Sequence, residues 1–202
     1  NESILNYYRQ PSPMTDLTGL EDVLRDTPND LAGIVRMIHG LMLHVFWAER
    51  EGFTPSEERK AEVQYYTARQ YIERIVELSD APLTEPRPLE QKVLGNCRDH
   101  SVLLCALLRR QGIPARARAG CGAYFIPDHW EDHWICEYWD EEQKRWIMVD
   151  AQLNPFQCQA MKITFNPLEV PTDQFWTSGK LWLGARAGEV DPEKCGIFDI
   201  HG

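Results

Sequence analysis

A short segment in the middle of the chain combines the features that make a cysteine nucleophilic. Cys97 falls in the first turn of an expected helix. Asn96 is the expected N-cap, and Asp99, three residues later, is its expected partner in a capping box. The partial positive charge at a helix N-terminus favours the thiolate, which is the nucleophilic form of cysteine. Gly95 lets backbone and substrate approach closely. We therefore expect Cys97 to be a nucleophile; the alternative is a small buried residue, which is what we expect of Cys105.

A base and its orienting partner are expected on an antiparallel hairpin. Strand-like segments at 133–140 and 144–151 flank two glutamates, which predicts a two-residue turn. In that register His133 lies directly opposite Asp150, and a shift by two residues keeps both on one face because strand side chains alternate. A carboxylate beside an imidazole fixes its tautomer and stabilises the imidazolium. The alternative is a structural His–Asp pair, or two strand-end residues that face solvent.

The elements that must position these residues can be predicted from hydrophobic spacing. Residues 1–26 are expected to be irregular, followed by a helix from Thr27–Pro28 to about Glu49 and a more polar helix from Thr54–Pro55 to about Leu78. A proline-rich connection at 80–90 separates this N-terminal helical region, residues 1–80, from a catalytic core with a C-terminal extension, residues 81–202. We expect the two regions to pack as one compact unit.

The core itself should be a buried helix on a sheet. The predicted helix 97–111 is apolar on every side from Val102 to Leu108, which is typical of a helix buried all round. Gly112 and Pro114 end it. Strands are expected at about 115–125, 133–140 and 144–151, whereas the pattern after residue 152 is broken by prolines.

Four sequence blocks, in this order, resemble the transglutaminase-like superfamily. The blocks are Gly95–Asp99, Arg109–Arg116, Asp132–Trp134 and Trp146–Asp150. The resemblance covers about residues 90–155 and implies an α+β, papain-like core, in which the cysteine helix packs on the antiparallel sheet that carries His and Asp. It also implies that Cys97, His133 and Asp150 form a catalytic triad. The superfamily includes protein crosslinkers, cysteine peptidases, peptide amidases such as peptide:N-glycanases, and inactive members, so the reaction stays open.

Further residues are candidates for binding the substrate or its oxyanion. The backbone N–H of Cys97 is the natural first oxyanion donor. Papain-like enzymes carry a glutamine six residues before the nucleophile, and Gln91 stands at that offset; the alternative is an exposed linker residue. His129 is a candidate for the cleft rim. Aromatic residues that surround the expected base could form a wall for the acyl donor or belong to the core: Tyr124, Phe125, Trp130 and Trp134.

The remaining histidines and cysteines suggest no metal centre or redox motif. His129 and His133 are four residues apart, but the segment between them reads as a loop and no other ligands cluster nearby. We expect His39, His44 and His100 to be structural. The cysteines are scattered without a Cys-x-x-Cys pair, so we expect six free thiols and a reducing, cytoplasmic setting.

Charge and hydropathy narrow the classes of partner. The chain has 202 residues, 31 acidic and 21 basic, and a net charge of −10, without a basic cluster, which argues against nucleic acid and anionic membranes as partners. No apolar run approaches the roughly 20 residues that span a bilayer, and residues 1–10 lack a signal-peptide pattern. The oligomeric state stays open.

Together these features predict thiol chemistry on a peptide or another carboxamide. Attack by Cys97 would give a thioester acyl-enzyme, which water or an amine resolves. We expect hydrolysis, without a cofactor or metal. The alternatives are an inactive transglutaminase-like binding or scaffold module, and a small-molecule acyltransferase or amidase of a biosynthetic pathway.

Overall fold

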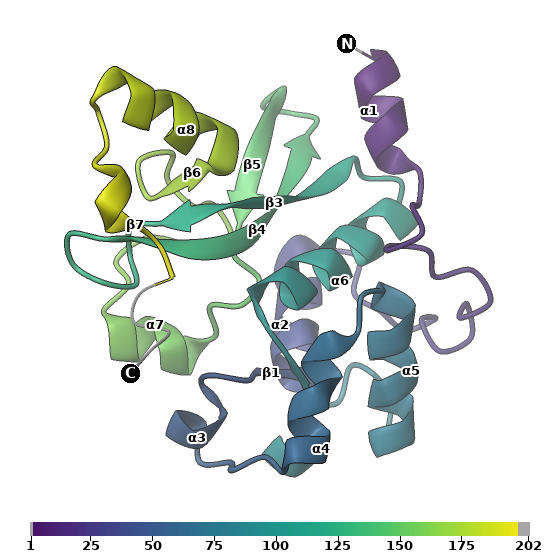
Figure 1. The fold of residues 1–202 in the computed structure, drawn as a ribbon. Helices are drawn as coiled ribbons and strands as arrows, with labels where there is room; N and C mark the ends of the chain where they lie inside the picture. The colour runs from purple at the N-terminus through teal and green to yellow at the C-terminus, as the bar shows by residue number, and fades with distance from the viewer. Residues whose placement is uncertain (1, 198–202) are drawn as a thin grey trace.

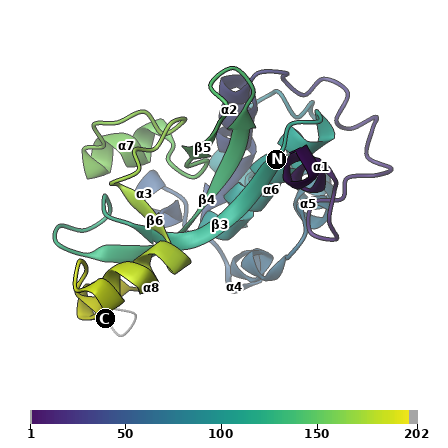
Figure 2. The ribbon, with the colours of Figure 1, turned by 90° about the horizontal axis from the view of Figure 1, so that it is seen from above.

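The computed structural model describes residues 2–197, which form an α+β fold with a curled antiparallel sheet (Figure 1). The sheet order is β5-β4-β3-β6, and β7 runs parallel beside β4. Figure 2 shows α7 and α8 at one end of this sheet and α1 and α5 at the other. The strand bounds are β3 (Ala115–Gly122), β4 (Trp130–Asp140), β5 (Arg145–Val149), β6 (Phe175–Thr177) and β7 (Cys195–Gly196).

The cysteine helix is the centre of the hydrophobic core, as the sequence predicts. Helix α6 (Cys97–Arg110) contacts β3 and β4 on one side and α2 (Leu31–Leu41) and α5 (Ala68–Leu78) on the other (Figure 1). Every residue from Asp99 to Leu108 is buried. A helix that is apolar on all sides is removed from water only when other elements pack against every side of it. The expected α+β class, with a cysteine helix packed on an antiparallel sheet, is therefore confirmed.

The first predicted helix is shorter than its hydrophobic spacing indicates. Asp30, not Thr27, caps it by accepting a hydrogen bond from the Gly33 N–H, and the helix ends at Leu41. The next residues form β1 (Met42–His44), which pairs in parallel with β2 (Val93–Gly95), before the short helix α3 (Ala48–Glu51). The prediction of one helix to Glu49 was wrong because pairing with a segment about 50 residues away overrides local propensity.

The second predicted helix is also interrupted. Helix α4 (Glu57–Lys60), capped by Ser56, passes into a 3₁₀ turn, and α5 begins anew at a capping box between Thr67 and Gln70. The break places the Glu62 carboxylate, which is 3% exposed, against the N–H of Leu94 on β2 at 2.8 Å. This contact fixes the strand that leads into the cysteine helix.

The N-terminal residues are more regular than expected. Residues Glu2–Arg9 form helix α1, which lies near the start of β3 and contacts β3 and α6 (Figure 1). Its Tyr8 ring lies 5.2 Å from the Arg116 guanidinium, and that guanidinium lies 4.0 Å from the Trp146 ring. Cation–π contacts of this kind hold the helix on the sheet.

The hairpin that carries the expected base has a longer turn than predicted. Asp140 pairs with Arg145, so four residues form the turn, with Lys144 at a φ of 52°. The predicted register was therefore wrong by two residues, and Asp150 follows the end of β5 instead of lying opposite His133. Because a two-residue shift preserves the face of a strand, both side chains still point to the same side.

The C-terminal third adds short elements that the sequence did not predict. Helix α7 (Pro155–Met161) begins at the Asn154 cap, and helix α8 (Ser178–Ala187) follows β6 directly. Within residues 2–197, no helix combines the length and the apolar character needed to cross a membrane.

Candidate active site

Cys97 is the first residue of α6, immediately after β2. The Asp99 carboxylate accepts a hydrogen bond from the Asn96 N–H at 2.8 Å, and the Arg98 side chain donates to the same carboxylate. A Cβ at Gly95 would lie 2.7 Å from the flexible end of the Met42 side chain and 3.1 Å from the Asp99 side chain, so glycine leaves room for both side chains. The sequence thus places the cysteine at a helix N-terminus that is fixed by the Asp99 hydrogen bond to the Asn96 N–H and by the parallel strand pair, whereas the Asn96 side-chain oxygen makes no capping hydrogen bond.

His133 and Asp150 form a buried pair next to Cys97. The His133 Nε2–H donates to Asp150 Oδ2 at 2.8 Å, and the two side chains are 2% and 0% exposed. Burial alone lowers the pKa of His133, but the Asp150 carboxylate and a side-chain hydrogen bond with Cys97 raise it to about 10. With Nε2 bound to Asp150, Nδ1 is the ring nitrogen left for Cys97. The structure therefore brings together the three side chains that the sequence singles out.

The Asp150 carboxylate has two further hydrogen-bond donors. The Tyr124 O–H donates to the same Oδ2 at 2.6 Å, and the Gln152 N–H donates to Oδ1 at 3.0 Å. Burial raises the pKa of Asp150, but His133 and these two donors hold it below its ordinary value. The local sequence around Tyr124 predicts only a wall or core residue, because nothing in it reveals a partner 26 positions away.

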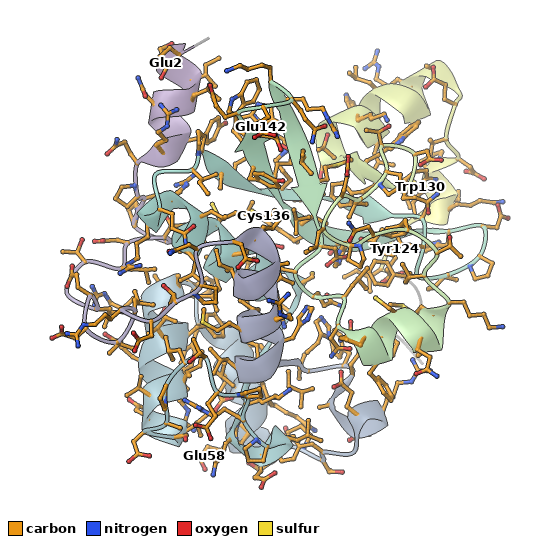
Figure 3. The ribbon with its side chains drawn as sticks, turned by 180° about the vertical axis from the view of Figure 1, so that it is seen from behind. Glu2, Glu58, Tyr124, Trp130, Cys136 and Glu142 are labelled. Carbon is orange, nitrogen blue, oxygen red and sulfur yellow. The ribbon has the colours of Figure 1, made fainter. Side chains whose placement is uncertain are left out.

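Tyr124 lies on the segment between β3 and β4 (Figure 3). Its ring packs 4.5 Å from Phe125 and 5.2 Å from Phe165. Phe125 in turn lies 4.7 Å from the His133 ring. These rings shield the His–Asp pair from water, which strengthens the interaction between its charges.

Cys97 and His133 line one open cleft of about 450 Å³. Aromatic side chains, including Phe46, Trp47 and Phe125, form much of its wall. Phe46 is 82% exposed, an unusual state for a large apolar side chain. The cleft thus presents apolar aromatic surface beside Cys97 and His133.

Three candidate substrate residues lie outside this cleft. Gln91 is in the 3₁₀ turn Leu89–Gln91, and it does not line the cleft as the structure describes it. His129 donates from Nε2 to the Gly196 carbonyl at 2.8 Å and thus secures β7. Trp130 lies beside α8, with its ring 5.1 Å from Trp176 (Figure 3). In the described part of the chain none of the three lines the cleft with Cys97, and their substrate roles stay predictions.

His44 is a cleft residue that the sequence analysis missed. Its hydrophobic spacing predicts a helix, but it lies on β1, opposite Gly95 of β2, and lines the cleft with Cys97. His100 donates from Nδ1 to the Asn96 carbonyl at 2.9 Å, and His39 donates from Nε2 to the Ala151 carbonyl at 3.0 Å. His39 and His100 thus have the structural contacts expected of them.

The described residues offer no group of three or more His, Cys, Asp or Glu side chains that could hold a metal ion. The six cysteines are all unpaired in the described structure.

Comparison with known proteins identifies the family. The model of the transglutaminase-like superfamily matches residues 49–151, half of the chain, and the chain belongs to this superfamily. A solved structure, described as that of a putative cysteine protease from Cytophaga hutchinsonii, superimposes with a TM-score of 0.52 at 18% identity. The match covers 88% of this chain but only 46% of that one, and at this identity it bears on the fold alone. No curated protein matches the chain. Family membership supports a cysteine-based enzyme class.

Proposed function

We propose that the protein is a thiol-dependent amide hydrolase that acts on a peptide or another carboxamide through Cys97, His133 and Asp150. The observation that carries the proposal is the position of the His133 ring, hydrogen-bonded to buried Asp150 and in contact with Cys97 in an open cleft. Nucleophile, base and orienting carboxylate are then in the order that acyl transfer requires.

At the start of the first half of the reaction, the thiol proton of Cys97 is already on His133, and an electron pair of the resulting thiolate sulfur attacks the carbonyl carbon. The carbonyl π electrons move to oxygen and give a tetrahedral oxyanion. When the oxyanion collapses, the carbonyl re-forms and the C–N bond breaks. The leaving nitrogen takes the proton from His133, which leaves a thioester on Cys97.

In the second half, His133 takes a proton from water while the water oxygen bonds to the thioester carbon. Collapse breaks the C–S bond, releases the acid and regenerates the thiolate–imidazolium pair. Asp150 keeps its charge throughout and stabilises the imidazolium. An amine could replace water in this step, but water is always present, so hydrolysis is the reaction proposed.

The test uses p-nitrophenyl acetate and a set of blocked dipeptide amides, with acid quenching and mass analysis of the intact protein. We expect one acyl group on the wild type, located at Cys97 by peptide mapping, and ammonia release from at least one amide. Cys97→Ala should form no adduct. If the wild type forms no adduct on Cys97 and releases no more ammonia than Cys97→Ala, the proposal is wrong.

A further inference from the structure

The cleft contains one imidazole that the reaction above does not use. We infer that His44 is a second oxyanion donor, and that its Nε2–H binds the substrate oxygen that becomes negative when Cys97 attacks. This inference rests on the proposed function and adds a catalytic residue to it.

The backbone fixes His44 beside the nucleophile. In the parallel pair of β1 and β2, His44 is in register with Gly95, which is two residues before Cys97. The Val45 N–H donates to the Gly95 carbonyl at 2.9 Å and locks this register. His44 and Cys97 line the same cleft. The ring therefore belongs to the rigid strand pair that feeds the cysteine helix, and not to a loop.

The hydrogen bonds of the ring determine which nitrogen carries the proton. The Phe46 N–H donates to His44 Nδ1 at 3.3 Å, so Nδ1 is the acceptor and a neutral ring has its hydrogen on Nε2. Within residues 2–197, Nε2 has no hydrogen-bond partner. The polar atoms that are both enclosed and without a partner do not include Nε2 of His44. Nε2 is therefore accessible from the cleft. A directed N–H with no protein acceptor is what an oxyanion donor requires.

The electrostatic surroundings keep this ring neutral. Burial lowers the pKa of His44 well below its ordinary value, and the nearby His100 and His133 lower it further. A neutral ring donates a hydrogen bond without competing for the proton of the thiol. His133, with a raised pKa, is the base, and His44 is only a donor.

The geometry completes a pair of donors. The N–H of Cys97 is one of the first four of α6, which have no acceptor within the helix. As the S–C bond forms, the carbonyl electrons move to oxygen, and this N–H and His44 Nε2–H stabilise the negative charge without transferring a proton. On collapse both hydrogen bonds weaken, and the leaving group takes its proton from His133.

Two reagents distinguish this role from a structural one. Iodoacetamide alkylates the thiolate by displacement at carbon and forms no oxyanion, whereas p-nitrophenyl acetate acylates it through a tetrahedral oxyanion. The variants are His44→Leu, which fills the space without a donor, and His44→Gln, whose side-chain amide N–H reaches about as far as Nε2. Alkylation and the acylation burst are measured for both variants and the wild type.

We expect His44→Leu to lower the acylation rate by about 100-fold, as for other oxyanion donors, and to leave the alkylation rate within about twofold. His44→Gln should recover most of the acylation rate. Unchanged acylation in His44→Leu, or an equal loss of both reactions, would overturn the assignment of His44 while leaving the proposed function in place. A wild type that forms no acetyl-Cys97 would instead contradict the proposed function, and this inference with it.

Discussion

Replacement of Tyr124 by phenylalanine removes one hydrogen bond and keeps the packing of the ring. The Tyr124 O–H lies 2.6 Å from Oδ2 of Asp150, a carboxylate that is fully buried. The ring contacts with Phe125 and Phe165 do not involve the hydroxyl. The change in stability therefore reports the hydrogen bond to the carboxylate almost alone.

The expected magnitude follows from the charge of the acceptor. Hydrogen bonds to charged groups contribute about 1.5–3 kcal/mol, and a buried carboxylate that loses a donor cannot turn to water instead. We expect Tyr124→Phe to lower the free energy of unfolding by about 2 kcal/mol at pH 7. With an m-value of about 2 kcal/mol/M for a chain of this size, the urea midpoint falls by about 1 M.

The assay is urea unfolding of the wild type and variant, followed by tryptophan fluorescence. Tyr7→Phe is the matched control, because Tyr7 is 73% exposed on α1, and a surface change of this kind stays within about 0.5 kcal/mol. A loss below about 0.5 kcal/mol in Tyr124→Phe would show that the hydroxyl does not stabilise a charged carboxylate. The buried ion pair of Asp150 and His133 would then need a different explanation.

Two further predictions concern buried charges. Glu62 forms ion pairs with Arg59 and Arg74 and is 3% exposed. We expect Glu62→Gln to lower the free energy of unfolding by about 3 kcal/mol, the low end for a broken buried ion pair, because both arginines are partly exposed to solvent. In urea unfolding, the surface variant Glu57→Gln should leave the midpoint unchanged, and equal effects of the two substitutions would contradict this role of Glu62. Burial lowers the pKa of His39 from 6.5 to about 4, so the unfolded chain binds more protons and stability falls as the pH drops from 6.5 to 4. His39→Gln should remove about 3 kcal/mol of this decrease in the free energy of unfolding. The measurement is the urea midpoint at a series of pH values across that range. If stability changes with pH equally in the variant and the wild type, His39 does not titrate in this way.

The sequence predicted which three side chains lie together better than it predicted the elements around them. The position of Cys97 depends on the start of a helix, and the sequence signals for that start lie within a few residues. Such local signals do not depend on how distant segments pack. His133 and Asp150 share a face because strand side chains alternate, so even a register error of two residues left them together. Local rules were sufficient for these three residues.

Residues whose roles depend on distant segments could not be predicted in this way. His44 joins the cleft only because three residues of β1 pair with β2, about 50 positions along the chain. Tyr124 reaches Asp150 because the segment between β3 and β4 lies beside the residue that follows β5. Gln91 shows the opposite case, in which the offset from the cysteine matched a known pattern but the side chain does not line the cleft. In each of these three cases the packing of distant segments, and not the local sequence, determines where the side chain lies.

The most direct test of the central claim is the pH dependence of the rate at which iodoacetamide alkylates Cys97, with the labelled peptide identified by mass. We expect Cys97 to react faster than the other five cysteines near neutral pH. In His133→Ala, alkylation near neutral pH should slow, because the thiol loses the side chain that takes its proton, and Asp150→Asn should slow it less. An unchanged profile in His133→Ala would mean that the helix N-terminus alone controls this thiol, and would contradict the assignment of His133 as its base.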